Sequence, residues 1–125
     1  MVSLTKKRIL CVDDSEDNCD LFSFILTEAE YEVESAYSFT EALQIIKTRQ
    51  FNLCLFDINL PDGTGFELLE KVHAINPSIS IIVCSGNGDD FTHQQAMQAG
   101  AQAFLTKPID FDLLVKTINQ LLKLD

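Results

Sequence analysis

Five polar side chains of this sequence are of the types that bind a divalent cation and handle a phosphoryl group. They are Asp13, Asp14, Asp57, Ser85 and Lys107. Three carboxylates in one crevice repel one another, and their pKa values rise unless a cation shares the site. Oxygen ligands suit Mg²⁺, which also neutralises charge during phosphoryl transfer. Because Lys107 can hold a second phosphoryl oxygen and Ser85 can donate to a third, the set predicts Mg²⁺-dependent phosphoryl chemistry.

Each of these residues also has a plainer explanation when it is considered alone. The two adjacent aspartates can cap the helix that follows them, Asp57 can cap a turn, and Lys107 can be an exposed surface cation. Caps do not, however, require a hydroxyl, a lysine and three acids all at the ends of apolar runs. Taken together, the residues favour a functional cluster.

The elements that position these side chains follow from an alternation of apolar runs with helical patterns, which predicts a parallel sheet with helices on both faces. Four runs are almost uninterrupted, as expected of strands covered on both sides. They are Ile9–Val12, Asn52–Phe56, Ile79–Cys84 and Ala101–Leu105. Polar residues interrupt Tyr31–Ala36, which predicts a partly exposed edge strand. Because the carboxyl ends of parallel strands lie at one edge of the sheet, the polar side chains there are expected to converge.

Helix boundaries are marked by residues that cap helices. Two capping boxes are predicted, in which a hydroxyl and a carboxylate each satisfy an otherwise unpaired amide. They are formed by Ser38 with Glu41 and by Thr64 with Glu67. Further helix ends and starts are predicted at Asn76, Gly100 and Asp110. The sequence thus predicts five strands and five helices.

With these residues and the loop Asp57–Gly65, which contains Pro61, the sequence resembles the receiver domains of response regulators along essentially its whole length. The resemblance implies an α/β fold with a doubly wound five-stranded parallel sheet in the flavodoxin-like order 2-1-3-4-5, five helices, and a single domain over residues 1–125. It implies a phosphoacceptor of a two-component system or phosphorelay. Such a domain is not an enzyme for an external substrate and catalyses only its own phosphorylation and dephosphorylation.

The resemblance also assigns the metal site. Asp57 is the phosphoacceptor and a Mg²⁺ ligand, Asp14 a direct ligand, and Asp13 a ligand usually through water. Asn59 is expected to add its backbone carbonyl. Mg²⁺ is therefore the expected cofactor.

Catalysis and switching are assigned in the same way. Ser85 and Lys107 complete the catalytic set with Asp57, and Ser85 with Phe104 forms the expected switch. The resemblance implies a cis peptide bond before Pro108, which aims the lysine at the crevice.

Some positions depart from the family pattern. Gly63 stands where the family often has a larger apolar residue, and Glu30 where glycine is common. Asn59 and Asn87 occupy positions that tune dephosphorylation in the family, and their pairing leaves the lifetime of the phosphoryl group open.

Composition excludes several classes of partner. The chain has 19 acidic and 9 basic residues and a formal charge of −10, which argues against direct contact with nucleic acid or an anionic membrane. No apolar stretch is long enough to span a bilayer, and no cleavage signal precedes the first strand. The cysteines form no C-x-x-C pair and are expected to be core residues in a reducing compartment, the cytoplasm. They are Cys11, Cys19, Cys54 and Cys84.

The expected partners are a histidine kinase or histidine phosphotransfer protein and a downstream protein target. The first helical pattern has more apolar residues than one inward stripe needs, so part of it is available for such a partner. The residues concerned are Leu21, Phe22, Phe24 and Ile25. His73 and His93 are predicted to be surface residues without a role in the chemistry.

Two other classes of function share parts of this pattern. Phosphatases of the haloacid dehalogenase type also use an aspartyl nucleophile, but their Asp-x-Asp pattern is broken here by Asn59. A pseudo-receiver or flavodoxin-like binding module would keep the fold without phosphorylation. The complete polar set argues against the first of these modules, and the lack of a phosphate loop after the first strand against flavin. The sequence leaves open the kinase, the target, the oligomeric state, and whether the chain acts alone or within a longer protein.

Overall fold

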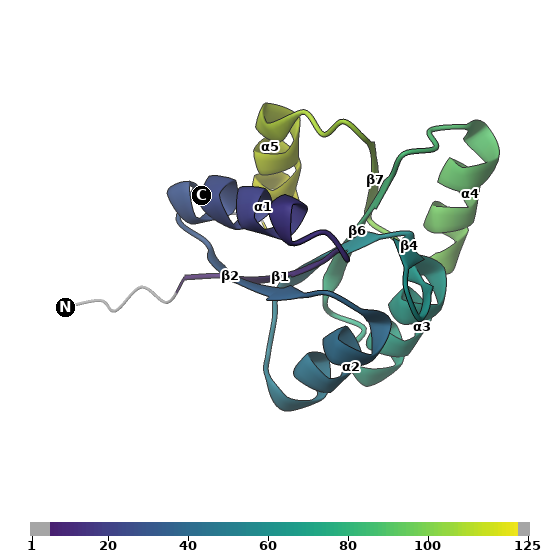
Figure 1. Cartoon of the computed structure of the whole chain (residues 1–125), viewed down its shortest axis with the longest axis horizontal. Coiled ribbons are helices and arrows are strands. Elements are labelled where there is room, and N and C mark those ends of the chain that lie inside the picture. Colours follow the sequence, from purple (N-terminus) through teal and green to yellow (C-terminus); the bar gives the residue numbers. More distant parts are fainter. Residues whose placement is uncertain (1–5, 123–125) are drawn as a thin grey trace.

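A computed structural model describes residues 6–122. Residues 1–5 and 123–125 lie outside the described residues, and so does the start of the chain, for which no cleavage signal is predicted. At the centre is a parallel sheet of five strands in the order β2-β1-β3-β6-β7 (Figure 1). The strands are β1 (Arg8–Val12), β2 (Glu32–Ala36), β3 (Leu53–Asp57), β6 (Ser80–Ser85) and β7 (Ala103–Thr106). Counted within this sheet alone, the order is 2-1-3-4-5, so the predicted doubly wound topology is confirmed.

Helices cover both faces of this sheet. They are α1 (Glu16–Glu28), α2 (Phe39–Thr48), α3 (Gly65–Ile75), α4 (Asp90–Ala99) and α5 (Phe111–Leu122). In Figure 1, α1 and α5 lie above the sheet and α2 and α3 below it. Buried side chains form one cluster with α1 and α5 and a second cluster with α2, α3 and α4. Among residues 6–122 no helix has the length and apolarity needed to cross a membrane.

The central strands are buried on both faces. In β1, Ile9 and Cys11 pack toward α1 and α5, whereas Leu10 and Val12 pack into the opposite cluster. This alternation explains why the strand reads as an uninterrupted apolar run. Strand β2 lies at an edge of the sheet and is fully buried only at Ala36, so the predicted partly exposed edge strand is confirmed.

A short hairpin follows β3. It consists of β4 (Asn59–Leu60) and β5 (Gly63–Thr64), which pair antiparallel. The sequence predicts only a tight turn here. Two-residue strands carry no periodic signal, so the pairing becomes visible only in the structure.

The two predicted capping boxes form only in part. The Ser38 and Thr64 hydroxyls accept the amides of Glu41 and Glu67, both at 3.1 Å, as predicted. The other half of each prediction is wrong, because neither glutamate carboxylate accepts the backbone amide of the N-cap residue. The Glu41 carboxylate accepts the amide of Tyr37, and the Glu67 carboxylate accepts the hydroxyl of Thr64 itself. Each carboxylate accepts a hydrogen bond from a different donor near the start of its helix.

The other predicted helix ends are confirmed. Asn76 ends α3, Gly100 ends α4 with a left-handed φ of 111°, and the Asp110 carboxylate accepts the amide of Leu113 at the start of α5. His73 is less exposed than expected of a surface residue. It is half-buried, and its Nε2 lies 3.1 Å from the carbonyl oxygen of Ile79, which follows α3.

Candidate functional site

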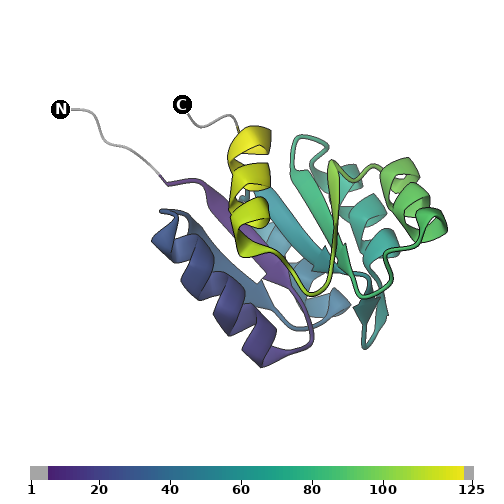
Figure 2. The same ribbon diagram turned by 90° about the horizontal axis from the view of Figure 1, so that it is seen from above.

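The five polar side chains predicted to converge meet at the carboxyl edge of the sheet. Asp57 and Ser85 are the last residues of their strands, and the other members directly follow β1 and β7. Parallel pairing aligns Asp57 with Cys84 and Ser85 with Thr106, so these strands end level with one another. Figure 2 shows the strand ends gathered at this edge.

Three carboxylates form an acidic cluster, which consists of Asp13, Asp14 and Asp57. One oxygen from each lies within 4.8 Å of the others. Asp13 is buried, Asp57 partly buried and Asp14 exposed, so the cluster opens to solvent on one side. Hard oxygen ligands in this number, beside an open face where water can complete the shell, fit Mg²⁺.

The neighbouring cysteines do not alter this preference for a hard ion. All four are free and buried. Burial raises the pKa of the Cys84 thiol to about 12, and the ammonium of Lys107 offsets only part of that effect. The thiol is therefore protonated at neutral pH and offers no soft thiolate ligand.

Lys107 bridges two members of the acidic cluster. Its Nζ lies 3.1 Å from Asp57 Oδ2 and 3.2 Å from Asp13 Oδ2. Partial burial lowers the pKa of Lys107, but the carboxylates of Asp57 and Asp13 raise it by more, and the net pKa lies above its usual range. The lysine is thus held in its charged form against the carboxylate of Asp57.

Asp13 is fixed by the first turn of α1 as well as by the lysine. Its Oδ1 accepts the amide of Ser15 at 2.9 Å, and its Oδ2 accepts the side-chain Nδ2 of Asn18 at 3.2 Å. Sequence reasoning missed Asn18. Its position one turn into the helix, close after the two aspartates, is the signal that would have found it.

The loop that follows Asp57 is shaped by close backbone contacts. The amide of Asn59 donates to Asp57 Oδ1 at 3.2 Å, and the amide of Gly65 donates to the carbonyl of Ile58 at 2.7 Å. A Cβ on Gly65 would lie 2.7 Å from the carbonyl oxygen of Asp57. Only glycine lets α3 begin this close to the backbone of Asp57.

Ser85 and Lys107 are joined through the backbone. The amide of Lys107 donates to the carbonyl of Ser85 at 2.8 Å, and the peptide bond between Lys107 and Pro108 is cis, the configuration implied by the resemblance. The Ser85 side chain is buried, and its hydroxyl accepts the amide of Asn87 at 2.9 Å. That hydroxyl keeps its own proton free for a further acceptor.

The ring of Phe104 lies half-buried beside α4. It packs against the core cluster that includes α2, α3 and α4. It also stacks on His93, with ring centroids 5.1 Å apart and an interplanar angle of 11°. His93 is exposed, as predicted, but its ring contacts Phe104. Sequence spacing carries no signal for this stack because it depends on how α4 is placed against β7.

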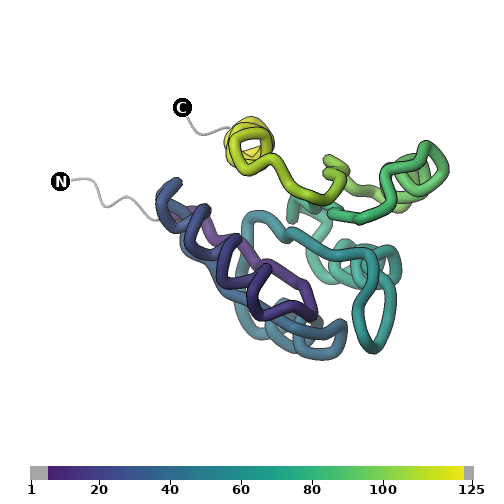
Figure 3. Tube along the Cα trace, turned by 45° about the horizontal axis from the view of Figure 1, so that its top comes forward, coloured from purple at the N-terminus to yellow at the C-terminus, as the bar shows by residue number. Residues whose placement is uncertain are grey.

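The excess apolar residues of α1 divide between core and surface. Phe22 is buried and Ile25 half-buried, whereas Leu21 and Phe24 are 46% and 65% exposed. Figure 2 shows the start of α1 beside the segment that leads from β7 to α5, and Figure 3 traces the same two parts of the chain from another side. A mainly apolar hollow of about 310 Å³ lies between them. It is lined by Asn18, Leu21, Phe22, Lys107, Pro108, Ile109 and Phe111.

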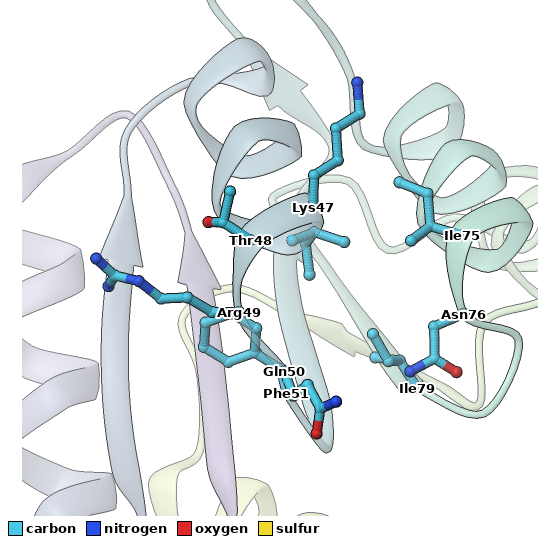
Figure 4. Close-up of a pocket in the computed structure, with 9 residues that line it drawn as sticks. Lys47, Thr48, Arg49, Gln50, Phe51, Ile75, Asn76 and Ile79 are labelled. Atoms are coloured by element: carbon cyan, nitrogen blue, oxygen red, sulfur yellow. The ribbon is translucent and has the colours of Figure 1, made fainter.

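A second hollow, of about 320 Å³, lies at the opposite edge of the sheet, between the ends of α2 and α3 (Figure 4). The figure shows the charged ends of Lys47 and Arg49 turned away from it. Arg49 Nη1 pairs with Glu34 Oε1 at 2.6 Å. The charged groups of Lys47 and Arg49 therefore do not face into the second hollow, and this hollow is not the candidate site.

Comparison with known proteins agrees with this geometry. Residues 9–119 match the model of the response regulator receiver domain. The chain belongs to this family. The receiver domain is 32% identical over 97% of its length to the response regulator protein PilR of Pseudomonas aeruginosa, and 32% identical over 94% of its length to the chemotaxis protein CheY of Thermotoga maritima.

These relatives differ in length. The receiver domain spans about a quarter (27%) of PilR but 98% of the Thermotoga CheY. It is also similar to the solved structure of a CheY-like response regulator receiver domain from Methanospirillum hungatei JF-1, with 39% identity, 95% coverage of each chain and a TM-score of 0.90. Membership of the family makes the chain a regulatory domain of two-component signalling.

Proposed function

We propose that the receiver domain accepts a phosphoryl group on Asp57 from a histidine kinase or histidine phosphotransfer protein, and that this modification switches its binding to a downstream protein. The observation that supports the proposal best is Lys107 Nζ, which lies 3.1 Å from the Asp57 carboxylate inside the acidic cluster. Such a placement balances charge at the atom that would carry the phosphoryl group.

In the proposed step a carboxylate oxygen of Asp57 bonds to phosphorus while the bond from phosphorus to the donor atom breaks. The donor atom is an imidazole nitrogen of phosphohistidine or the acetate oxygen of acetyl phosphate, and it keeps the electron pair. The Asn59 amide and Lys107 orient the Asp57 carboxylate from its two oxygens. No side chain needs to remove a proton, since the attacking group is a carboxylate and not a hydroxyl.

We assign the Mg²⁺ ligands to the acidic cluster and to the backbone carbonyl of Asn59, with Asp13 acting through water. Bound Mg²⁺ would supply charge neutralisation at the phosphoryl oxygens. The same residues would serve both self-phosphorylation and self-dephosphorylation, so the domain needs no external substrate beyond its phosphodonor.

Ser85 and Phe104 are proposed to carry the signal away from Asp57. The Ser85 hydroxyl would donate a charge-assisted hydrogen bond to the new phosphoryl group. Phe104 would then turn inward from its position against His93 and change the surface formed by α4, β7 and α5. We propose this surface as the one read by the downstream target.

We assign the binding surface for the histidine kinase or phosphotransfer protein to α1. The exposed side chains of Leu21 and Phe24 and the hollow beside Lys107 and Pro108 form an apolar surface next to the acidic cluster. An apolar surface of this kind suits the packing of a partner's helix close to Asp57.

The decisive experiment is incubation with acetyl phosphate, followed by intact-mass measurement. We expect one phosphoryl adduct in the presence of Mg²⁺, none with excess EDTA, and none in Asp57→Asn. Asp89→Asn, which changes an exposed helix-capping aspartate that is not a member of the acidic cluster, should keep the adduct. An adduct on Asp57→Asn would disprove the phosphoacceptor, and full modification in EDTA would disprove the metal requirement.

A further inference from the structure

The β4–β5 hairpin is fastened to the first turn of α2 by one side chain, Asp62, which lies in the turn of the hairpin. Its Oδ1 accepts the amide of Phe39 at 2.7 Å, and its Oδ2 accepts the amide of Thr40 at 3.0 Å and the hydroxyl of Thr40 at 2.7 Å. Bonds from Thr40 and Phe39 hold the pKa of Asp62 below its usual value. The carboxylate is therefore ionised at neutral pH, when its bonds to these donors are strongest.

Asp62 and Ser38 serve different donors at the start of α2. Ser38 accepts the amide of Glu41, whereas Asp62 accepts the amides of Phe39 and Thr40. The helix begins beside a negative charge, the sign that its N-terminal dipole favours. Since α2 has its own cap in Ser38, the Asp62 contact also attaches the hairpin to the helix.

Gly63 makes a second contact between the same two elements. A Cβ at this position would lie 2.7 Å from Cδ2 of Phe39, so the phenyl ring packs directly against the glycine backbone. This is the position at which the family often has a larger apolar residue. The ring of Phe39 approaches here because no side chain stands between α2 and the turn.

The pairing of β4 with β5 is too short to fix the turn of the hairpin by itself, although Leu60 packs into the core at its base. Its strands have two residues each, and even longer isolated hairpins are only marginally stable in water. Asn59 pairs with Thr64 in its register and donates its amide to Asp57. Whatever fixes the turn at Asp62 thus also restricts the backbone of Asn59 beside the acidic cluster.

We propose that Asp62 is a positioning residue for the metal site: by fastening the hairpin to α2 it holds the Asn59 backbone at the acidic cluster and strengthens Mg²⁺ binding. The inference rests on the proposed function, which assigns the Asn59 carbonyl to Mg²⁺. It also makes the first turn of α2 sensitive to events at the phosphoacceptor loop, through a contact that Asp62 and Gly63 provide in this chain.

The test is a Mg²⁺ titration of the full chain followed by amide NMR at Asp57 and Asn59, together with hydrogen exchange of the Asn59 amide. Asp62→Ala should weaken Mg²⁺ binding by about tenfold, as loss of a group that orients a metal ligand commonly does, and should speed exchange. Ser38→Ala is the matched control, because it removes a cap from the same helix start without touching the hairpin. It should leave both measurements unchanged.

Two further variants test the same contact if Asp62→Ala folds poorly. Asp62→Asn keeps one acceptor oxygen and should weaken binding less than the alanine variant. Gly63→Ala forces Phe39 away from the turn and should also weaken binding. Equal Mg²⁺ affinity in the wild type and Asp62→Ala, or equal weakening in Asp62→Ala and Ser38→Ala, would overturn the positioning role. A wild-type chain that binds no Mg²⁺ would instead overturn the proposed function.

Discussion

At the scale of single residues, Lys107 governs the electrostatics of the site. Its ammonium lies within 3.2 Å of two carboxylates, one of them almost fully buried. Replacement by an apolar side chain would leave Asp13 and Asp57 facing each other without the charge that separates them.

We therefore expect Lys107→Met to lower the free energy of unfolding by about 2 kcal/mol at pH 7 in EDTA. This is less than the roughly 3–5 kcal/mol of a fully buried pair, because 26% of the lysine side chain is exposed. Urea unfolding measures the change, and added Mg²⁺ should reduce it. Lys116→Met on the exposed side of α5 is the control and should have little effect.

The pKa of Lys107 predicts a pH dependence. A group whose pKa is higher in the folded state stabilises the protein fully below its unfolded pKa, and that stabilisation is lost as the pH rises through the folded pKa. The ordinary pKa is 10.5. The difference in unfolding free energy between wild type and Lys107→Met should be constant near neutrality and shrink only above about pH 10.5. A difference that shrinks between pH 7 and 9 would contradict this assignment.

At the scale of secondary-structure elements, the stack of Phe104 on His93 connects β7 to α4. We expect His93→Ala to free the Phe104 ring and to increase its inward population before any phosphoryl group is present. Ring resonances of Phe104 with and without beryllofluoride would measure this. Gln94→Ala, at the exposed neighbouring position, is the control. If beryllofluoride leaves Ser85 and Phe104 unmoved in the wild type, the proposed switch is wrong.

The same scale shows what the sequence could and could not predict. Four short apolar runs and one run interrupted by polar residues located the five strands of the main sheet to within two residues, and the rule for parallel strand ends brought Asp57 and Lys107 together. The role of Asp62 was not predictable, because its donors lie 22 and 23 positions away and an aspartate in a turn normally needs no partner. The His93 stack likewise depends on the packing of one element on another.

At the scale of the whole molecule, the exposed apolar residues lie on different faces. Phe24 on α1 is 65% exposed and Phe91 on α4 is 72% exposed. We expect Phe24→Asp to slow phosphoryl transfer from a phosphorylated histidine phosphotransfer protein by roughly tenfold, the effect of removing an apolar anchor from an interface. Modification by acetyl phosphate should be unchanged, since this small donor needs no docking surface.

Phe91→Asp is the control for this prediction, because it places the same charge on α4. It should leave transfer from the phosphotransfer protein at the wild-type rate. Equal slowing in both variants would show that added negative charge, rather than loss of the α1 surface, caused the effect.

The bridge from Lys107 to Asp13 spans 94 positions of the sequence. A nascent chain emerging from the ribosome therefore exposes the three carboxylates of the acidic cluster long before the lysine that balances them is synthesised. In the folded domain Lys107 reaches these carboxylates from the end of β7, which pairs with β6 at the edge of the sheet. Translation must thus pass the last strand before Lys107 can face the acidic cluster, and a chain interrupted earlier would carry Asp57 without the lysine that faces it.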